Sequence, residues 1–114
     1  MGKKGAKQTE SVKEFTAEMV EALTPVGEVS SRSMFGGYGI FESGVMFVLI
    51  DSAGKMFFRA DDSTQGRYEE LGSERHNPMP YFEVPSSVFE DYSTFIDWAK
   101  EAAAVAHAAK KKSK

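Results

Sequence analysis

The longest uninterrupted run of apolar residues, Val45–Ile50, lies mid-chain between two short turn sequences. The turns, residues 42–44 and 51–54, each end in a glycine, which adopts positive φ at low steric cost. A half-solvated strand would alternate apolar with polar residues, so this run predicts a strand covered on both faces. Because successive side chains of a strand point to opposite faces, alternation predicts two sets: Val45, Phe47 and Leu49 on one face, and Met46, Val48 and Ile50 on the other.

Two more strands are predicted beside this one, so that residues 32–59 form three antiparallel strands. The first contains Gly36, Gly37 and Gly39, which indicate a bulge, a sharp bend or a close approach by another backbone. Residues 26–33 before it are predicted as a linker whose end can add a short strand. Residues 79–84 form a further strand, which Pro80 keeps near an edge of the sheet.

Helical patterns surround the predicted strands. Ser11 and Glu14 form a capping box that predicts a helix start, and the helix ends before Pro25. Asp62 is predicted as the N-cap of a short helix, and a long alanine-rich helix follows Asp91. The fold class predicted is α+β, a two-layer sandwich with helices on one face of an antiparallel sheet, in the order α-β-β-β-α-β-α.

The second face of the sheet needs a cover, and two explanations stay open. A terminal segment of the chain can fold over it. Alternatively, the face is a homodimer or partner surface, because monomers rarely expose large apolar patches.

Length and composition predict one soluble domain. The chain has 114 residues and no cysteine, which excludes disulfides, a thiol nucleophile and thiolate metal ligands. No apolar run approaches the roughly 20 residues of a membrane span, and the N-terminus lacks the apolar region of a secretory signal. We therefore expect a cytoplasmic protein with a domain at residues 10–109 and flexible basic tails at residues 1–9 and 110–114.

The net charge of −3 hides a segregation of charge. Seven of the 14 basic residues lie in the two tails. The domain between the tails therefore contains seven basic and 17 acidic residues. Nucleic-acid binding needs a clustered basic face, which an acidic core does not supply. The tails can add only weak contact with nucleic acid.

The residues that could carry catalysis form no catalytic pattern. His76 and His107 have no Asp or Glu spaced to orient them as bases, and the favourable charge at a helix C-terminus explains His107. Asp61 and Asp62 could be a metal or acid–base pair, but no third ligand is near and helix capping explains them better. The glycines at residues 36–39 could form a phosphate-binding loop, but no Gly-Lys-Ser/Thr sequence follows them, which counts against that function. We expect no enzyme, cofactor, metal or small-molecule substrate.

Two segments resemble a known family. Residues 32–41, RSMFGGYGIF, and residues 44–50, GVMFVLI, are similar to the N-terminal domain of TfoX/Sxy-type competence regulators. Residues 81–85 and the final helix around Trp98 are similar to the same family, so the resemblance covers residues 10–109. The MFGGYG sequence is its most specific part.

The resemblance implies a two-layer fold and a bacterial regulatory or interaction role, and it provides no catalytic residues. The fuller regulators carry a second, C-terminal domain where this chain has a lysine tail. The resemblance therefore does not imply direct transcriptional control of competence by this chain.

Three functions are compatible with these patterns. The first is a non-catalytic protein-interaction domain, as a homodimer or with another protein. Its candidate surface residues, which ordinary core and turn packing could also explain, are Arg32, Phe35, Tyr38, Phe41 and Phe57. The alternative is a nucleic-acid accessory domain using the lysine tails and Arg32. The third is a small-ligand binder with a pocket between sheet and helices, against which the apolar interior counts.

Overall fold

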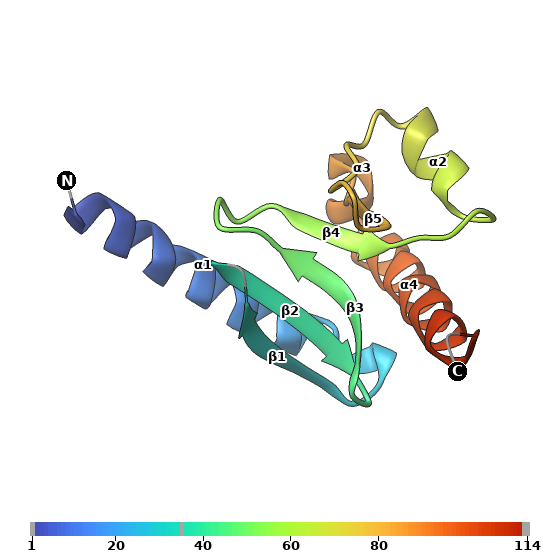
Figure 1. The fold of residues 1–114 in the computed structure, drawn as a ribbon, viewed down its shortest axis with the longest axis horizontal. Helices are drawn as coiled ribbons and strands as arrows, with labels where there is room; N and C mark the ends of the chain where they lie inside the picture. Colours follow the sequence, from blue (N-terminus) through green and yellow to red (C-terminus); the bar gives the residue numbers. More distant parts are fainter. Residues whose placement is uncertain (1, 35, 113–114) are drawn as a thin grey trace.

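The computed structural model describes residues 2–34 and 36–112. Five antiparallel strands form one sheet in the order of the sequence (Figure 1). They are β1 (Val29–Met34), β2 (Gly37–Glu42), β3 (Val45–Ile50), β4 (Met56–Arg59) and β5 (Tyr81–Glu83). The prediction of a linker is wrong for most of residues 26–33, because β1 pairs with β2 along its whole length.

The helices cover one face of this sheet, as predicted. They are α1 (Gly2–Ala22), the 3₁₀ helix η1 (Thr24–Val26), α2 (Gln65–Glu70), α3 (Ser86–Phe89) and α4 (Tyr92–Lys112). In Figure 1, α1 runs along β1 and β2, and α4 starts behind β4 and extends to the lower right. The helix α4 contacts both β3 and β4. Their apolar side chains and one face of the sheet make up the main core, which includes Leu23, Ile40, Phe58 and Ala99. The α+β two-layer class is therefore confirmed, with one strand and two short helices, η1 and α3, more than the predicted order.

A bulge in β3 changes which side chains reach the core. Ile40 pairs with Val48 and Phe41 with Met46, so Phe47 is the extra residue on β3. Phe47 and Val48 therefore both pack in the main core, and Met46 lies on the opposite face. The predicted strict alternation along Val45–Ile50 is wrong, because a bulge shifts the facing of every residue beyond it. Phe47 to Ile50 are nevertheless all buried.

Gly37 explains part of the glycine cluster at the start of β2. A Cβ on Gly37 would lie 2.0 Å from the carbonyl oxygen of Ile50. The close approach by another backbone, one of the predicted possibilities, is therefore confirmed at this position.

The helix termini differ from the sequence pattern. Ser11 lies well inside α1, so the predicted helix start there is wrong. Helical backbone also takes in residues 2–9 and 110–112, which the pattern assigns to the tails. His107 contacts Glu42 at the end of β2. The role predicted for His107, a favourable charge at a helix C-terminus, does not account for this contact.

Candidate interaction surface

The face of the sheet away from the helices has an open half over β1 and β2. There the guanidinium carbon of Arg32 lies 5.0 Å from the centre of the Phe41 ring, a cation–π distance. Arg32 is exposed, and Phe41 is half-buried. Arg32 pairs with Gly39 across the strands, so a glycine lies beneath the pair.

Gly39 makes room for two methionines on this open half. A Cβ on Gly39 would lie 2.9 Å from the Met46 sulfur and 3.1 Å from the Met34 sulfur. Both methionines are half-buried. Flexible, polarisable methionine side chains adapt to differently shaped partners. We call Arg32, Met34, Phe41 and Met46 the helix-free patch.

The other half of this face is covered by the chain itself. Leu49, Phe57 and Tyr81 form a second small core, each less than 5% exposed, with Met46 and Met79 packed against it. The His76 ring meets the Phe57 ring edge-on, with 5.1 Å between ring centres. The segment before β5 that contains His76 and Met79, called here the covering segment, therefore covers this half of the face. The sequence pattern assigned that cover to a terminal segment or a partner.

Tyr81 joins this second core to the helix-free patch. Its hydroxyl donates to the carbonyl oxygen of Met46 over 3.2 Å. Burial raises the pKa of Tyr81, and the nearby Arg59 opposes part of that rise. The tyrosine therefore stays neutral, and its hydroxyl links β5 to β3 across the intervening strand β4.

A small cavity opens between the patch and the covering segment. Its volume is about 220 Å³. Its lining residues come from β1, from β3 and the residue after it, and from the covering segment: Met34, Leu49, Ile50, Asp51, His76 and Met79. The Nδ1 atom of His76 is buried and has no hydrogen-bond partner among the described residues. Pockets for small molecules usually have volumes of about 300 to 1,000 Å³, so this cavity is smaller than most of them.

The predicted surface residues do not share one face. Arg32 and Phe41 lie together on the helix-free patch. Phe57 is 4% exposed beneath His76, and Tyr38 packs against the main core on the helix face. Phe35 lies outside the described residues. The sequence pattern missed Met34. It lies two positions after Arg32 in β1 and therefore on the same face, so it could have been found had β1 been recognised.

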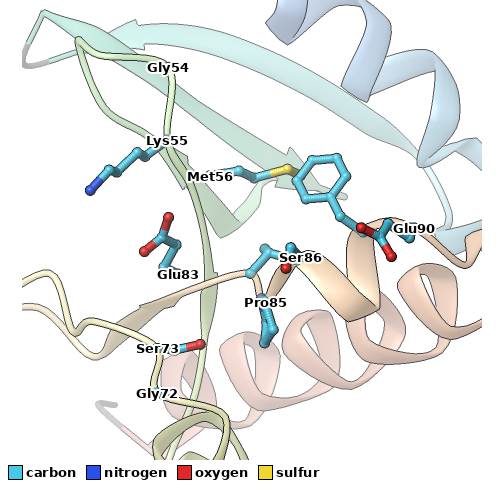
Figure 2. Close-up of a pocket in the computed structure, with 11 residues that line it drawn as sticks. Gly54, Lys55, Met56, Gly72, Ser73, Glu83, Pro85, Ser86 and Glu90 are labelled. Carbon is cyan, nitrogen blue, oxygen red and sulfur yellow. The ribbon is translucent and has the colours of Figure 1, made fainter.

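A larger cleft lies elsewhere, between the β3–β4 turn and α3 (Figure 2). Its volume is about 600 Å³. Lys55 and Glu83 lie at one side of it, and Ser86 and Glu90 lie at the other. Lys55 pairs with Glu74 over 3.6 Å, and both side chains are well exposed. Such exposed charges contribute little binding energy by themselves.

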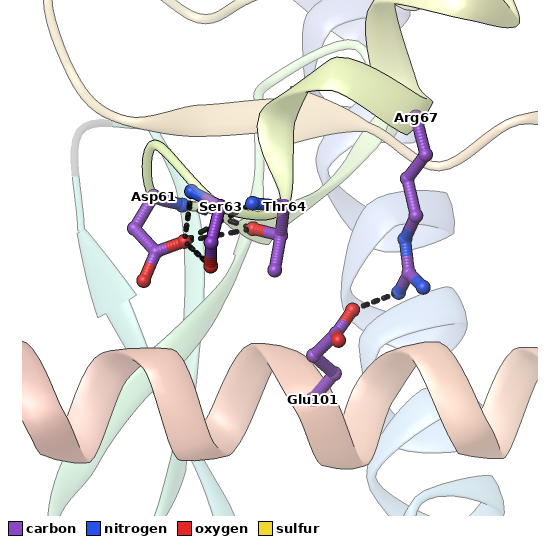
Figure 3. Close-up of polar contacts among 5 residues, drawn as sticks. All are labelled: Asp61, Ser63, Thr64, Arg67 and Glu101. Carbon is purple, nitrogen blue, oxygen red and sulfur yellow. Dashed lines mark hydrogen bonds and ion pairs between the residues drawn. The ribbon is translucent and has the colours of Figure 1, made fainter.

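Asp61 organises the turn before α2 (Figure 3). Its Oδ1 accepts hydrogen bonds from the backbone N–H groups of Ser63 and Thr64, at 2.9 and 3.1 Å, and from the Ser63 hydroxyl at 2.7 Å. The Ser63 hydroxyl is the main reason that the pKa of Asp61 is lowered. The prediction that Asp62 is the N-cap of this helix is wrong, because the N-cap residue is Thr64 and the side-chain bonds of the preceding turn go to Asp61. Among the described residues, no group of three or more His, Asp or Glu side chains could hold a metal ion.

Arg67 fastens α2 to α4. Its guanidinium pairs with Glu101 (Figure 3). The guanidinium carbon also lies 3.8 Å from the centre of the Trp98 ring. The ring of Tyr68, the residue after Arg67, meets the Trp98 ring edge-on. Burial raises the pKa of Tyr68. These groups join two elements of the helix layer, so they serve the fold and lie away from the helix-free patch.

These features define a class: a small α+β domain with all helices on one face of a five-stranded antiparallel sheet. A family model described as the TfoX N-terminal domain matches residues 21–106, so the chain belongs to that family. "DNA transformation protein TfoX1" of Aliivibrio fischeri is 42% identical over 50 residues. That match spans 44% of this chain and 23% of the relative, less than a quarter of its length. None of the described helices is long and apolar enough to span a bilayer.

Proposed function

We propose that this chain is a non-catalytic, cytoplasmic regulatory domain that acts by binding a protein partner through the helix-free patch. The observation that carries the proposal is the position of Met34, Phe41 and Met46, half-buried on the face that the helices leave open. Apolar and aromatic side chains at the centre of a contact provide most of its binding energy. Membership of the TfoX N-terminal domain family supports a regulatory role.

The chemistry of the patch suggests what the partner presents. Arg32 is a cation at the border of an apolar surface, and the adjoining cavity has room for one side chain. A segment with an apolar anchor beside an acidic residue would complement both features. The name of the relative, DNA transformation protein TfoX1, supports DNA transformation as the regulated process.

Transformation frequency tests this proposal. A competent bacterium lacking its own family member would express this chain, either unchanged or with Met34→Glu and Met46→Glu together. Because a carboxylate in an apolar contact is costly to desolvate, we expect transformation to fall at least tenfold at equal protein level. Leu71→Glu is the matched control, since Leu71 is 53% exposed at the end of α2. Equal transformation by the patch variant and the control would refute the proposal.

A second candidate is weak nucleic-acid binding through the lysine tails and Arg32. It is favoured by Lys110 and Lys111, which lie exposed in the last turns of α4. The acidic balance of the domain between the tails weighs against strong binding.

A further inference from the structure

The two edges of the sheet are protected very differently. β1 forms one edge and lies at the border of the sheet in Figure 1. It pairs with β2 over six residues without a bulge, and no further backbone hydrogen bond to Val29–Met34 is found among the described residues. Residues 30–33 are all exposed, and the strand contains no proline. An open, regular edge is a template for another strand.

The opposite edge is closed by the chain itself. β5 has only three residues and lies between Pro80 and Pro85. The backbone N–H of His76 donates to the carbonyl oxygen of Tyr81 over 2.8 Å, and Glu83 donates to Glu74 over 2.9 Å. Proline and a covering segment are usual protections of an edge strand. The fold therefore covers one edge and leaves the longer one available.

Arg32 is the only charged residue within β1, and it does not extend across the edge. Its guanidinium lies over the Phe41 ring of the neighbouring strand β2. The side chain is thus directed back over the sheet, and the backbone edge beside it stays accessible.

We propose that a second copy of this chain binds at this edge, with the two β1 strands antiparallel. When the pairing of a strand with its own copy is centred on one residue, paired residues have equal parity, so equivalent residues of the two copies lie on the same face. Both helix layers would then lie on one side of a continuous sheet, and the two helix-free patches would lie on the other. This inference rests on the proposed function, because it identifies one partner of the same interaction domain.

Charge complementarity supports the choice of a second copy. Glu28 is exposed just before β1. Its backbone bonds to Glu42 and Ser43 at the β2–β3 turn, which holds it beside the start of the edge. Pairing centred on Ser30 places Arg32 directly opposite the partner's Glu28. Pairing centred on Ser31 places the same two side chains diagonally, still within reach of long side chains. Either arrangement brings together two opposite-charge pairs, related by the two-fold axis.

A charge swap tests the pairing. Light scattering and sedimentation equilibrium across a concentration series would give the dimer dissociation constant of the full chain. Arg32→Glu alone and Glu28→Arg alone should each raise that constant about tenfold, because both pairs become repulsive. The double variant should restore it to within about threefold of the parent. Glu69→Arg is the control, since Glu69 lies exposed on α2.

A single variant at Arg32 also loses the contact between Arg32 and Phe41. The double variant does not restore that contact, so any recovery of association comes from the pairing of residues 28 and 32 between copies. Rescue of association would establish the Glu28–Arg32 pairing between copies. A monomer at every concentration would overturn the proposal, as would a dimer that neither single variant weakens. Transformation by the Met34 and Met46 variant is measured separately, so failure here is distinguishable from failure of the proposed function.

Discussion

His107 on α4 holds Glu42 at the end of β2, although 65 residues separate them in sequence. The His107 Nε2 atom lies 2.7 Å from Glu42 Oε1. Glu42 also accepts a hydrogen bond from the Ser43 hydroxyl over 2.7 Å and one from the Glu28 backbone N–H over 3.3 Å. One carboxylate therefore ties together the last helix, the β2–β3 turn and the start of the β1 edge.

The Glu42 contacts predict a pH-dependent contribution to stability. The Ser43 hydroxyl chiefly, with His107, lowers the pKa of Glu42 in the folded chain. A lowered carboxyl pKa stabilises the fold above the unfolded value of about 4.3, and this stabilisation is lost as pH falls further. Glu42→Gln should be less stable by about 1 kcal/mol at pH 7, and the gap should close between about pH 5 and pH 3. Urea unfolding at several pH values measures it; a gap independent of pH would contradict the role assigned to the carboxylate.

Substitutions at Met46 and Val48 test the bulge in β3. Val48 is fully buried among the helices, whereas Met46 lies half-buried on the helix-free patch. Val48→Lys should cost about 3 kcal/mol or more in the free energy of unfolding, because it buries a charge. Met46→Glu should cost about 1 kcal/mol or less. Denaturant unfolding compares the two, and equal costs would place both side chains on one face, as simple alternation predicts.

Gly37 and Gly66 should respond oppositely to alanine. A Cβ on Gly37 would collide with backbone, whereas a Cβ on Gly66 in α2 would meet nothing within 4 Å. Gly37→Ala should therefore destabilise by about 2 kcal/mol or more through forced separation of β2 and β3. Gly66→Ala should stabilise by about 0.5 to 1 kcal/mol, because alanine has the higher helix propensity. Thermal unfolding gives both signs, and stabilisation by Gly37→Ala would contradict the close strand approach.

Nucleic-acid binding through the tails makes a separate prediction. If the lysines bind phosphates, affinity for duplex DNA should fall steeply with added salt, by about one unit of log–log slope per phosphate neutralised. Removing residues 1–8 and 110–114 should abolish that binding. Fluorescence anisotropy with labelled DNA measures it. Salt-insensitive binding, or binding that survives the truncation, would contradict the tail hypothesis.

Sequence predicts the sheet better than it predicts the surface, for identifiable reasons. Turn glycines such as Gly44 and Gly54 bound the strands clearly, and both adopt positive φ. The run Val45–Ile50 is apolar throughout, so no polar residue marks the point where the bulge reverses facing. β1 was not recognised because four of its six residues are polar, so its sequence lacks the alternation of apolar and polar residues typical of a half-buried strand.

The candidate surface shows the same limit. Tyr38 and Phe41 are three positions apart on β2, so alternation alone could have placed them on opposite faces. Phe57 is buried by a segment about 20 residues further along the chain, and no local pattern reveals that contact. Arg32 and Phe41 lie together because β1 pairs with β2, and their role in binding a partner stays a prediction.

The accessibility of residue 46 in living cells tests most directly whether the helix-free patch is occupied by a partner. The chain contains no cysteine, so Met46→Cys provides a single site for a maleimide, and Glu69→Cys on α2 provides the matched control. The labelling rate of each variant would be compared between the dilute purified chain and competent cells. We predict that position 46 reacts at least tenfold more slowly in cells, relative to position 69. Equal relative rates in both settings would contradict the claim that this face binds a partner.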